Sequence, residues 1–346
     1  MIIYAMTINN KIANASFIAA LMVVGIHTSG RAPNVIEGSS ALWWLEVIGH
    51  YGFFLIAVPF FFICSGYFLA GHMEGCGWWK REFSKRMRTL LVPYIVWSLV
   101  YALLPLTVFF LANLMHGRIA FLEHYASIRF WVNAFGLNPF AWPQLVPLWY
   151  MRALLMFVAI SPLLFYFLKK SRYWGLLILW CVSLTVGIYG WYVQDRLYLM
   201  LTKCFNVSGL FYFCCGIYGR LNNVSLPKQG HAFALAYGVS CAVANGYCRM
   251  SGIKFVFPLW VPMLLFGLWK FVPLRPLPKW LIGASFAIFM LHTVVYRCLD
   301  IAFNFTVENI PEWIVKWLIG VVGSLLVAVT LRKLWPKLAS LVFGGR

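Results

Sequence analysis

Two histidines offer the first chemistry in this sequence, because each belongs to a long apolar segment. His27 ends an apolar run, and Ser16 precedes it by three helical turns, on the same helical face and about 16 Å away along the axis. His292 and Ser285 likewise share one face of a later segment. A neutral imidazole can take a proton from a hydroxyl group near neutral pH. His27 is therefore a candidate general base, and His292 is either an interfacial residue or a proton-handling group beside a wet cavity.

A third candidate is the hydroxyl group of Ser65, which stands beside Gly66 in the aromatic segment Val58–Phe68. A hydroxyl group inside lipid is costly unless it is hydrogen-bonded or used, so Ser65 is a candidate catalytic residue. The alternative is a packing helix, in which Ser65 donates to a carbonyl one turn back and Gly66 permits close helix approach. Composition by itself favours the packing interpretation.

The sequence lacks the motifs of several other kinds of site. The nine cysteines form no C-x-x-C pair and are expected to be small buried hydrophobic residues. His116, Glu123 and His124 have no recognised ligand spacing, so we expect no metal site. Motifs for phosphate loops, dinucleotides, zinc proteases and serine hydrolases are also missing.

The elements that hold these residues are membrane helices. Hydrophobic residues make up 62% of the 346 residues and charged residues only 11%, which is too apolar for a soluble fold. About ten segments approach the roughly 20 residues that a spanning helix needs. They run at about Ile12–Thr28, Tyr51–Ala70, Leu90–Met115, Leu148–Leu168, Tyr173–Val193, Phe205–Leu221, Ala232–Tyr247, Phe255–Val272, Leu281–Leu299 and Trp313–Leu331. We therefore expect an all-α integral membrane protein, with residues 1–346 forming one bundle in the lipid bilayer.

The distribution of Lys and Arg predicts the orientation of this bundle. With a cytoplasmic N-terminus, about 18 of the basic residues lie inside and about 10 outside, as the positive-inside rule requires. Both termini are then cytoplasmic, and the first apolar segment is a retained helix because no small-x-small cleavage site follows it. The net charge of +19 reflects this topology and contact with anionic lipids, so we expect no nucleic-acid partner. The oligomeric state stays open.

Several segments, taken in order, resemble the acyltransferase-3 family of membrane acyltransferases, which includes O-acetyltransferases of bacterial surface polysaccharides. They are Leu21–Thr28, Val58–Phe68, the basic run Lys85–Arg88 with Pro93-Tyr94, Leu148–Leu155, Phe211–Arg220 and Ser285–His292. The resemblance implies a bacterial inner-membrane enzyme that moves an acetyl or similar short acyl group. The implied donor is cytoplasmic acetyl-coenzyme A, a co-substrate and not a permanent cofactor, and the acceptor is a hydroxyl or amine of a surface glycan or small molecule.

The resemblance also gives two further groups of residues a role. Lys85, Arg86 and Arg88 face the cytoplasm and are expected to hold the phosphates of coenzyme A, the alternative being topology alone. Trp149, Tyr150 and Arg152 fall at the predicted outer interface. There they either contact a sugar or the developing oxyanion, or simply anchor the helix while Arg152 snorkels. Ser285 joins them as a substrate-binding candidate.

One departure from the family concerns the first helix. The family usually carries Arg or Lys at the position of Ser16, often with an Asp where this chain has Ala13. Either Lys11 or another helix supplies that cation, or the donor chemistry differs. Ser16 can still donate a hydrogen bond.

Two other functions remain alternatives. A transporter or flippase of a glycan precursor would use the same polar helices as a pathway, but ion-coupled transport favours intramembrane acidic residues. The nine acidic residues are all expected in or near loops, which argues against such coupling. They are Glu37, Glu46, Glu74, Glu82, Glu123, Asp195, Asp300, Glu308 and Glu312. The second alternative is a catalytically degenerate family member that acts as a partner subunit.

Overall fold

The computed structural model describes residues 2–29, 36, 38, 40–73, 75–116, 125, 127–255 and 257–345. Every regular element in these residues is a helix, which confirms the predicted all-α membrane class. The chain divides into two compact units, treated separately below. Unit 1 comprises Met1–Gly71, Tyr212–His292 and Thr306–Ala328, and unit 2 comprises His72–Phe211, Thr293–Phe305 and Val329–Arg346. The single domain stays a prediction.

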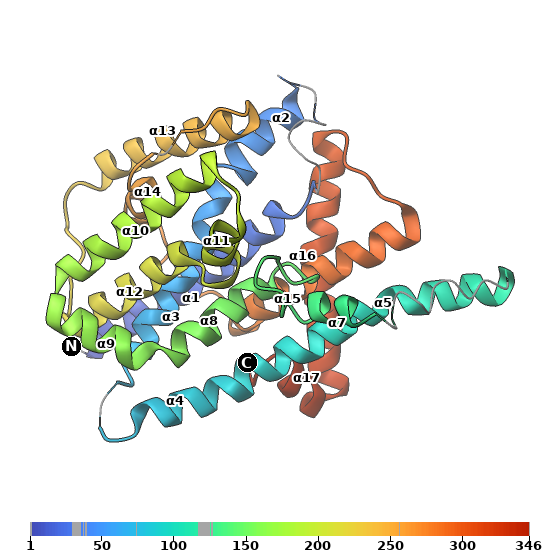
Figure 1. The fold of residues 1–346 in the computed structure, drawn as a ribbon, viewed down its shortest axis with the longest axis horizontal. Coiled ribbons are helices and arrows are strands. Elements are labelled where there is room, and N and C mark those ends of the chain that lie inside the picture. The colour runs from blue at the N-terminus through green and yellow to red at the C-terminus, as the bar shows by residue number, and fades with distance from the viewer. Residues whose placement is uncertain are drawn as a thin grey trace. The chain divides into compact units, whose positions relative to one another are not determined.

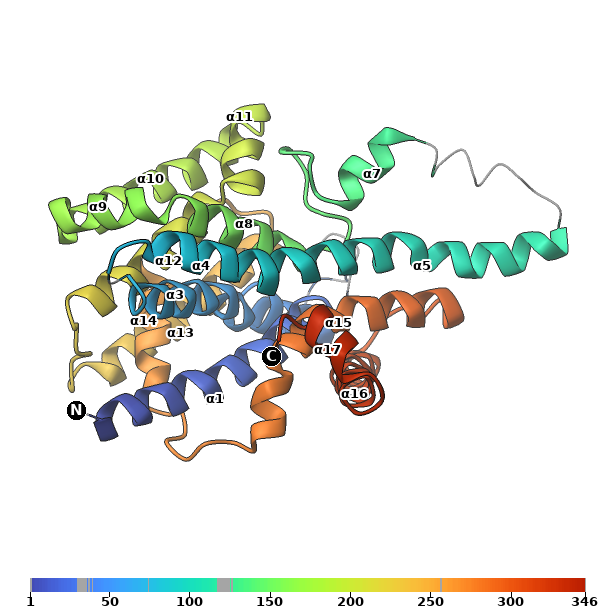
Figure 2. The same ribbon diagram turned by 90° about the horizontal axis from the view of Figure 1, so that it is seen from below.

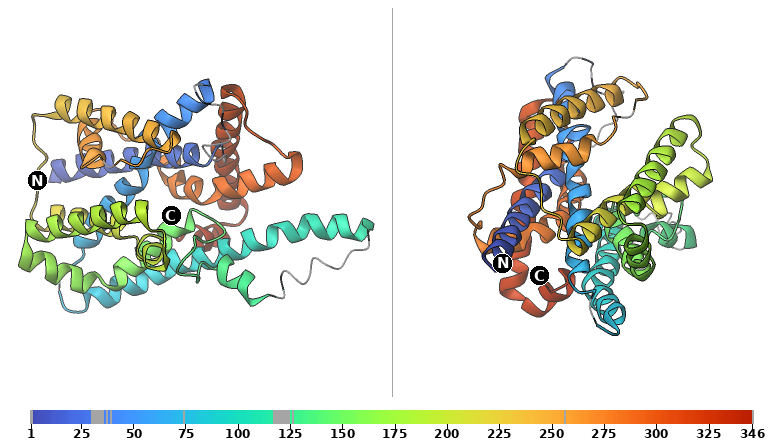
Figure 3. Two further views of the ribbon diagram at one scale, coloured as in Figure 1. Left: turned by 45° about the horizontal axis from the view of Figure 1, so that its top comes forward. Right: turned by 90° about the vertical axis from the view of Figure 1, so that its left-hand side faces the viewer.

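Unit 1 is built around the first helix, α1 (Ile2–Ile26), which contacts α3 and the short helices before it. Its other complete elements are α2 (Ala41–Leu45), the π-helix η2 (Glu46–His50), the 3₁₀-helix η3 (Phe53–Ile56), α3 (Ala57–Ala70), α13 (His231–Met250) and α14 (Trp260–Trp269). The last two lie side by side (Figures 1 and 3). Three long helices pass from one unit to the other: α12 (Val207–Leu221), α15 (Lys279–Phe303) and α16 (Ile310–Leu334).

Glycines bring α3 and α12 into backbone contact. A Cβ atom on Gly66 would overlap the carbonyl of Phe213, and one on Gly216 would overlap the carbonyl of Ile63. Small residues allow membrane helices to approach this closely. The packing role predicted for Gly66 is therefore confirmed.

Unit 2 begins with α4 (Trp78–Arg86), the π-helix η4 (Met87–Leu91) and α5 (Val92–His116), which follow one another in line (Figure 2). Its other elements are α7 (Ile128–Ala134), α8 (Leu148–Ala159), α9 (Ser161–Ser171), α10 (Tyr173–Tyr192), α11 (Arg196–Leu199), the π-helix η5 (Met200–Cys204) and α17 (Pro336–Val342). The indole of Trp97 donates to the Val342 carbonyl at 2.8 Å and so ties α5 to the end of α17.

In the part of the chain that the structure describes, seven helical stretches are long and apolar enough to cross a membrane. They are Asn9–Ile26, Ala41–Ala70, Trp78–Pro105, Tyr173–Tyr192, Arg196–Leu221, Lys279–Phe303 and Ile310–Leu334. The pair α8 and α9, bent by 66° where Pro162 lies in the first turn of α9, brings this number to eight if the pair counts as one broken span. The chain is thus a multi-pass membrane protein.

The remaining two predicted segments form shorter or more polar helices. The segment Ala232–Tyr247 lies in α13, which is not among the sufficiently apolar stretches, and Phe255–Val272 contains the ten-residue helix α14. Ten residues rise only about 15 Å, half of the hydrocarbon thickness. The count of ten spanning helices and the cytoplasmic termini therefore stay predictions.

The prediction that every acidic residue lies in or near a loop is wrong. Glu46 is 1% exposed on η2, inside the apolar stretch Ala41–Ala70, and Glu82 is 6% exposed on α4. Both precede the apolar cores that the sequence pattern identified, so they looked like loop residues. Glu37, Glu74 and Glu123, together with His124, lie outside the described residues.

Candidate active site

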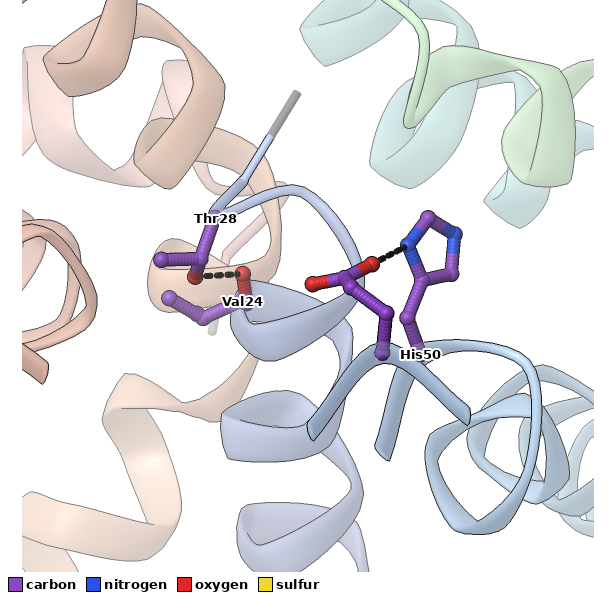
Figure 4. A network of polar contacts seen from close by, with 4 residues as sticks. Val24, Thr28 and His50 are labelled. Carbon is purple, nitrogen blue, oxygen red and sulfur yellow. Dashed lines mark hydrogen bonds and ion pairs between the residues drawn. The ribbon is translucent and has the colours of Figure 1, made fainter. Parts of the chain in front are cut away.

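His27 leaves the end of α1 in a hydrogen-bonded turn. Its backbone N–H donates to the Val24 carbonyl at 3.2 Å. The hydroxyl group of Thr28 donates to the same oxygen at 2.9 Å, as Figure 4 shows. Ala20 and Val24 are fully buried, so α1 is held by its packing up to its last turn. The turn therefore gives the half-buried His27 a fixed direction.

His292 meets His27 from α15. The two imidazole rings lie 5.3 Å apart between centroids, with their planes inclined by 33°. His292 is completely buried, and its Nδ1 atom lies 3.0 Å from the Ile288 carbonyl. A carbonyl oxygen only accepts hydrogen bonds, so Nδ1 of His292 carries the proton and Nε2 carries the lone pair. The structure thus joins the two histidines that the sequence proposed separately.

A buried carboxylate lies beside the same end of α1. Oε2 of Glu46 and Nδ1 of His50 are 2.8 Å apart on η2. The Glu46 side chain is 2% exposed and that of His50 is 20% exposed. Figure 4 shows His50 next to the end of α1, with one ring nitrogen on the carboxylate and the other pointing away from it. Sequence reasoning missed this pair, although Glu and His four residues apart before an apolar run were a signal.

The ring of Phe54 fixes the distance between α1 and η2. A Cβ atom on Gly25 would come within 2.6 Å of Cε2 of this ring, and one on Gly49 within 2.9 Å of the same atom. Both glycines therefore make room for Phe54, which also stacks on Trp313 at 6.3 Å. Gly25 lies two residues before His27, and Gly49 directly precedes His50. The Phe54 ring therefore packs between the two backbone segments that carry these histidines.

The predicted serines occupy unit 1 with the histidines. Ser65 is half-buried on α3. Ser285 is buried on α15 and donates to the Ile282 carbonyl at 2.8 Å. Its hydrogen is therefore used within its own helix, and only its oxygen lone pairs face the surroundings. The catalytic role of Ser65 and the substrate-binding role of Ser285 stay predictions.

The N-terminal half of α1 holds its polar groups in hydrogen bonds to backbone carbonyls. Ser16 donates to the Ile12 carbonyl at 2.7 Å, one turn back along the helix. Lys11 donates to the Trp269 carbonyl at 2.9 Å and lies 5.2 Å from the centre of the Trp269 ring. Its ammonium group thus covers the last turn of α14, where a positive charge is favourable.

Asn14 is a buried polar residue that sequence reasoning missed. Its amide group donates to the carbonyls of Pro273 and Arg275, at 2.8 and 2.9 Å, and its oxygen accepts from the Leu277 N–H at 3.0 Å. Asn14 therefore fastens the connection between α14 and α15 to α1. No spacing in the sequence pointed to this contact, because its partners lie more than 250 residues away.

The basic run of unit 2 surrounds a buried carboxylate. Lys85 and Arg86 lie 3.9 and 3.8 Å from the carboxylate oxygens of Glu82, while Arg88 is exposed. Nε of Arg86 is buried without a hydrogen-bond partner among the described residues. A distance of 3.8 Å between Arg86 and Glu82 is too long for a hydrogen bond. The guanidinium group of Arg86 can therefore still bind an anion or a water molecule.

Arg152 holds backbone carbonyls of unit 2. One terminal nitrogen of its guanidinium group donates to Gly136, and the other donates to Ala141 at 3.3 Å and to Lys203 at 2.6 Å. Trp149 packs against Trp142 at 5.1 Å, and Tyr150 is 8% exposed. These contacts fasten the segment after α7. The role of Trp149, Tyr150 and Arg152 in substrate binding stays a prediction.

Comparison with known proteins identifies the family of this chain. The acyltransferase-3 family, described as an acyltransferase domain, matches residues 14–333. The chain belongs to this family. The match spans both units and includes both paired histidines. The family predicted from the sequence is therefore confirmed.

The chain also resembles a curated protein, the succinoglycan biosynthesis protein ExoH of Rhizobium meliloti (strain 1021). The two are 28% identical over 235 residues, which is 64% of this chain and 56% of that protein. The match thus covers little more than half of the relative. No solved structure matches the chain.

Proposed function

We propose that the acyltransferase transfers an acetyl or similar short acyl group from cytoplasmic acyl-coenzyme A to a hydroxyl or amine of a cell-surface glycan. The contact between His27 and His292 carries this proposal, since it places two imidazoles together at the end of a membrane helix. A related protein named for succinoglycan biosynthesis supports a glycan acceptor. The location is the inner membrane of a bacterium, with about ten spanning helices and both termini in the cytoplasm.

In this reaction the acceptor hydroxyl attacks the carbonyl carbon of the thioester. The new C–O bond forms, the C–S bond breaks, and His27 takes the proton of the hydroxyl group. His292 supports His27 as a neutral neighbour: its lone pair lies at Nε2, because Nδ1 is committed to Ile288. The leaving thiolate takes up a proton from water, so the products are an ester and free coenzyme A.

The donor binds through its phosphates at Arg86 and Arg88. Arg86 has a buried Nε without a hydrogen-bond partner in the described residues, and Arg88 is exposed. Guanidinium groups bind phosphates by paired, charge-assisted hydrogen bonds. Glu82 offsets part of this positive charge and keeps Arg86 ordered when the donor is absent.

The test is an assay of the purified protein in nanodiscs with labelled acetyl-coenzyme A and an exported glycan. We expect transfer, or slow hydrolysis without acceptor, and a loss of about 10²–10⁴-fold in turnover for His27→Ala. His231→Gln is the matched control, because His231 bonds a backbone carbonyl at the start of α13. Near-normal transfer by a folded His27→Ala variant would refute the role of His27, and a wild-type chain that transfers nothing would refute the function.

A further inference from the structure

The pair formed by Glu46 and His50 has no part in the function proposed above, yet it buries a carboxylate in unit 1. Glu46 is 1% exposed inside an apolar stretch of helix. A buried carboxylate in such surroundings is retained only when it is paired, and it is a functional candidate by default. Its partner is Nδ1 of His50 at 2.8 Å.

The carboxylate determines which nitrogen of His50 can accept a proton. A carboxylate accepts hydrogen bonds, so Nδ1 of His50 carries the hydrogen and Nε2 carries the lone pair. Figure 4 shows this second nitrogen turned away from Glu46. Stacking on Tyr51, at 4.1 Å and nearly parallel, holds the ring in place. A carboxylate that orients an imidazole also stabilises the imidazolium that forms when Nε2 takes a proton.

The rings of His27 and His292 pack against each other. A proton taken up by His27 would place a positive charge next to a completely buried imidazole, 5.3 Å away. Among the described residues of unit 1, Glu46 is the buried carboxylate, since Glu308 is exposed and Glu312 is half-buried. The charge that forms during transfer is therefore best placed on His50.

The backbone holds the two sites together. A Cβ atom on Gly25 or on Gly49 would overlap the same atom of the Phe54 ring. Gly25 lies two residues before His27, and Gly49 directly precedes His50. His50 is also partly exposed, whereas His292 is not, so His50 can release a proton to water.

We propose that Glu46 and His50 form a proton-accepting dyad that serves His27 during acyl transfer, an inference that rests on the function proposed above. The proton of the acceptor hydroxyl passes to His27 as the C–O bond forms and the C–S bond breaks. It then moves to Nε2 of His50, where the Glu46 carboxylate stabilises the charge. His50 releases it to water, which balances the proton that the thiolate takes up. Both are positioning residues for His27.

The decisive variant is His50→Gln, because the Gln amide still donates to Glu46 but cannot carry a proton. We expect kcat for transfer to fall by about 10²-fold, while KM for donor and acceptor stays within about twofold. Glu46→Gln should behave in the same way, and Glu46→Asp, which restores a carboxylate, should recover most of the rate. His231→Gln serves again as the histidine control and should leave kcat unchanged.

The outcomes separate this inference from the proposed function. Transfer by His50→Gln at the wild-type kcat would overturn the dyad and leave the function standing. A loss of kcat in Glu46→Gln that Glu46→Asp does not recover would also overturn it, since it would indicate packing alone. If Glu46→Gln does not fold, the kcat of His50→Gln decides. A wild-type protein that transfers no acyl group would refute the function and the dyad together.

Discussion

At the scale of single residues, the proposed chemistry depends on pairs of side chains, which the sequence does not show as pairs. His27 lies against His292, and His50 lies against Glu46. Burying an isolated imidazole or carboxylate in lipid costs free energy, whereas two paired ionisable groups can hold a proton and pass it on. The basic run is also paired, because the carboxylate of Glu82 lies close to the charged groups of both Lys85 and Arg86.

The donor site gives a prediction at this scale. Replacing Arg86 and Arg88 together by Gln should weaken binding of acyl-coenzyme A by about 1.5–3 kcal/mol for each charged hydrogen bond lost, or roughly 10- to 10²-fold. Binding is measured by titration calorimetry in nanodiscs. Lys169→Gln with Lys170→Gln is the control, because this exposed basic pair ends α9 in the same unit. Unchanged affinity in the Arg variant would leave the basic run a topology signal only.

At the scale of elements, close helix packing decides where the side chains lie. The α3–α12 contact is made by two glycines, and the α1–η2 contact by two others around Phe54. Helices in lipid lack the hydrophobic drive that holds soluble helices together, so they depend on such close fits. The bend of 66° between α8 and α9 has an equally local cause in Pro162.

Two glycines of α12 provide a matched test of this packing. A Cβ atom at Gly216 would overlap the Ile63 backbone, whereas one at Gly219 meets no atom within 4 Å. Gly216→Ala should lower the free energy of unfolding by about 1–3 kcal/mol. Gly219→Ala should be neutral or raise it by up to about 1 kcal/mol, because alanine favours a helix. Unfolding in detergent measures both, and equal stability of the two variants would contradict the contact.

At the scale of the whole molecule, charge sets the orientation in the membrane. Cys76 lies between α3 and α4, beside the densest basic cluster, and it is exposed. The positive-inside rule predicts that this connection lies in the cytoplasm. The chain also bears a net charge of +19, which favours contact with anionic lipids on that side.

Cysteine labelling tests this orientation. We expect an impermeant maleimide to leave Cys76 unmodified in intact cells and to modify it once the membrane is permeabilised. Cys76→Ser identifies the signal, because eight other cysteines are present. Modification of Cys76 in intact cells would place Gly71–Thr89 outside and reverse the predicted topology.

The sequence by itself determined the class and the family and marked His27 and His292 as candidates, because apolar length and local motifs are properties of contiguous residues. Only the tertiary structure joined His27 to His292, buried Glu46 beside His50, and gave Asn14 its partners on a distant connection. It also showed that α14 has only ten residues and that Arg152 donates hydrogen bonds to backbone carbonyls. The physical reason is common to all of these: the energy of a buried polar group depends on its neighbours in space, and packing of distant helices selects those neighbours.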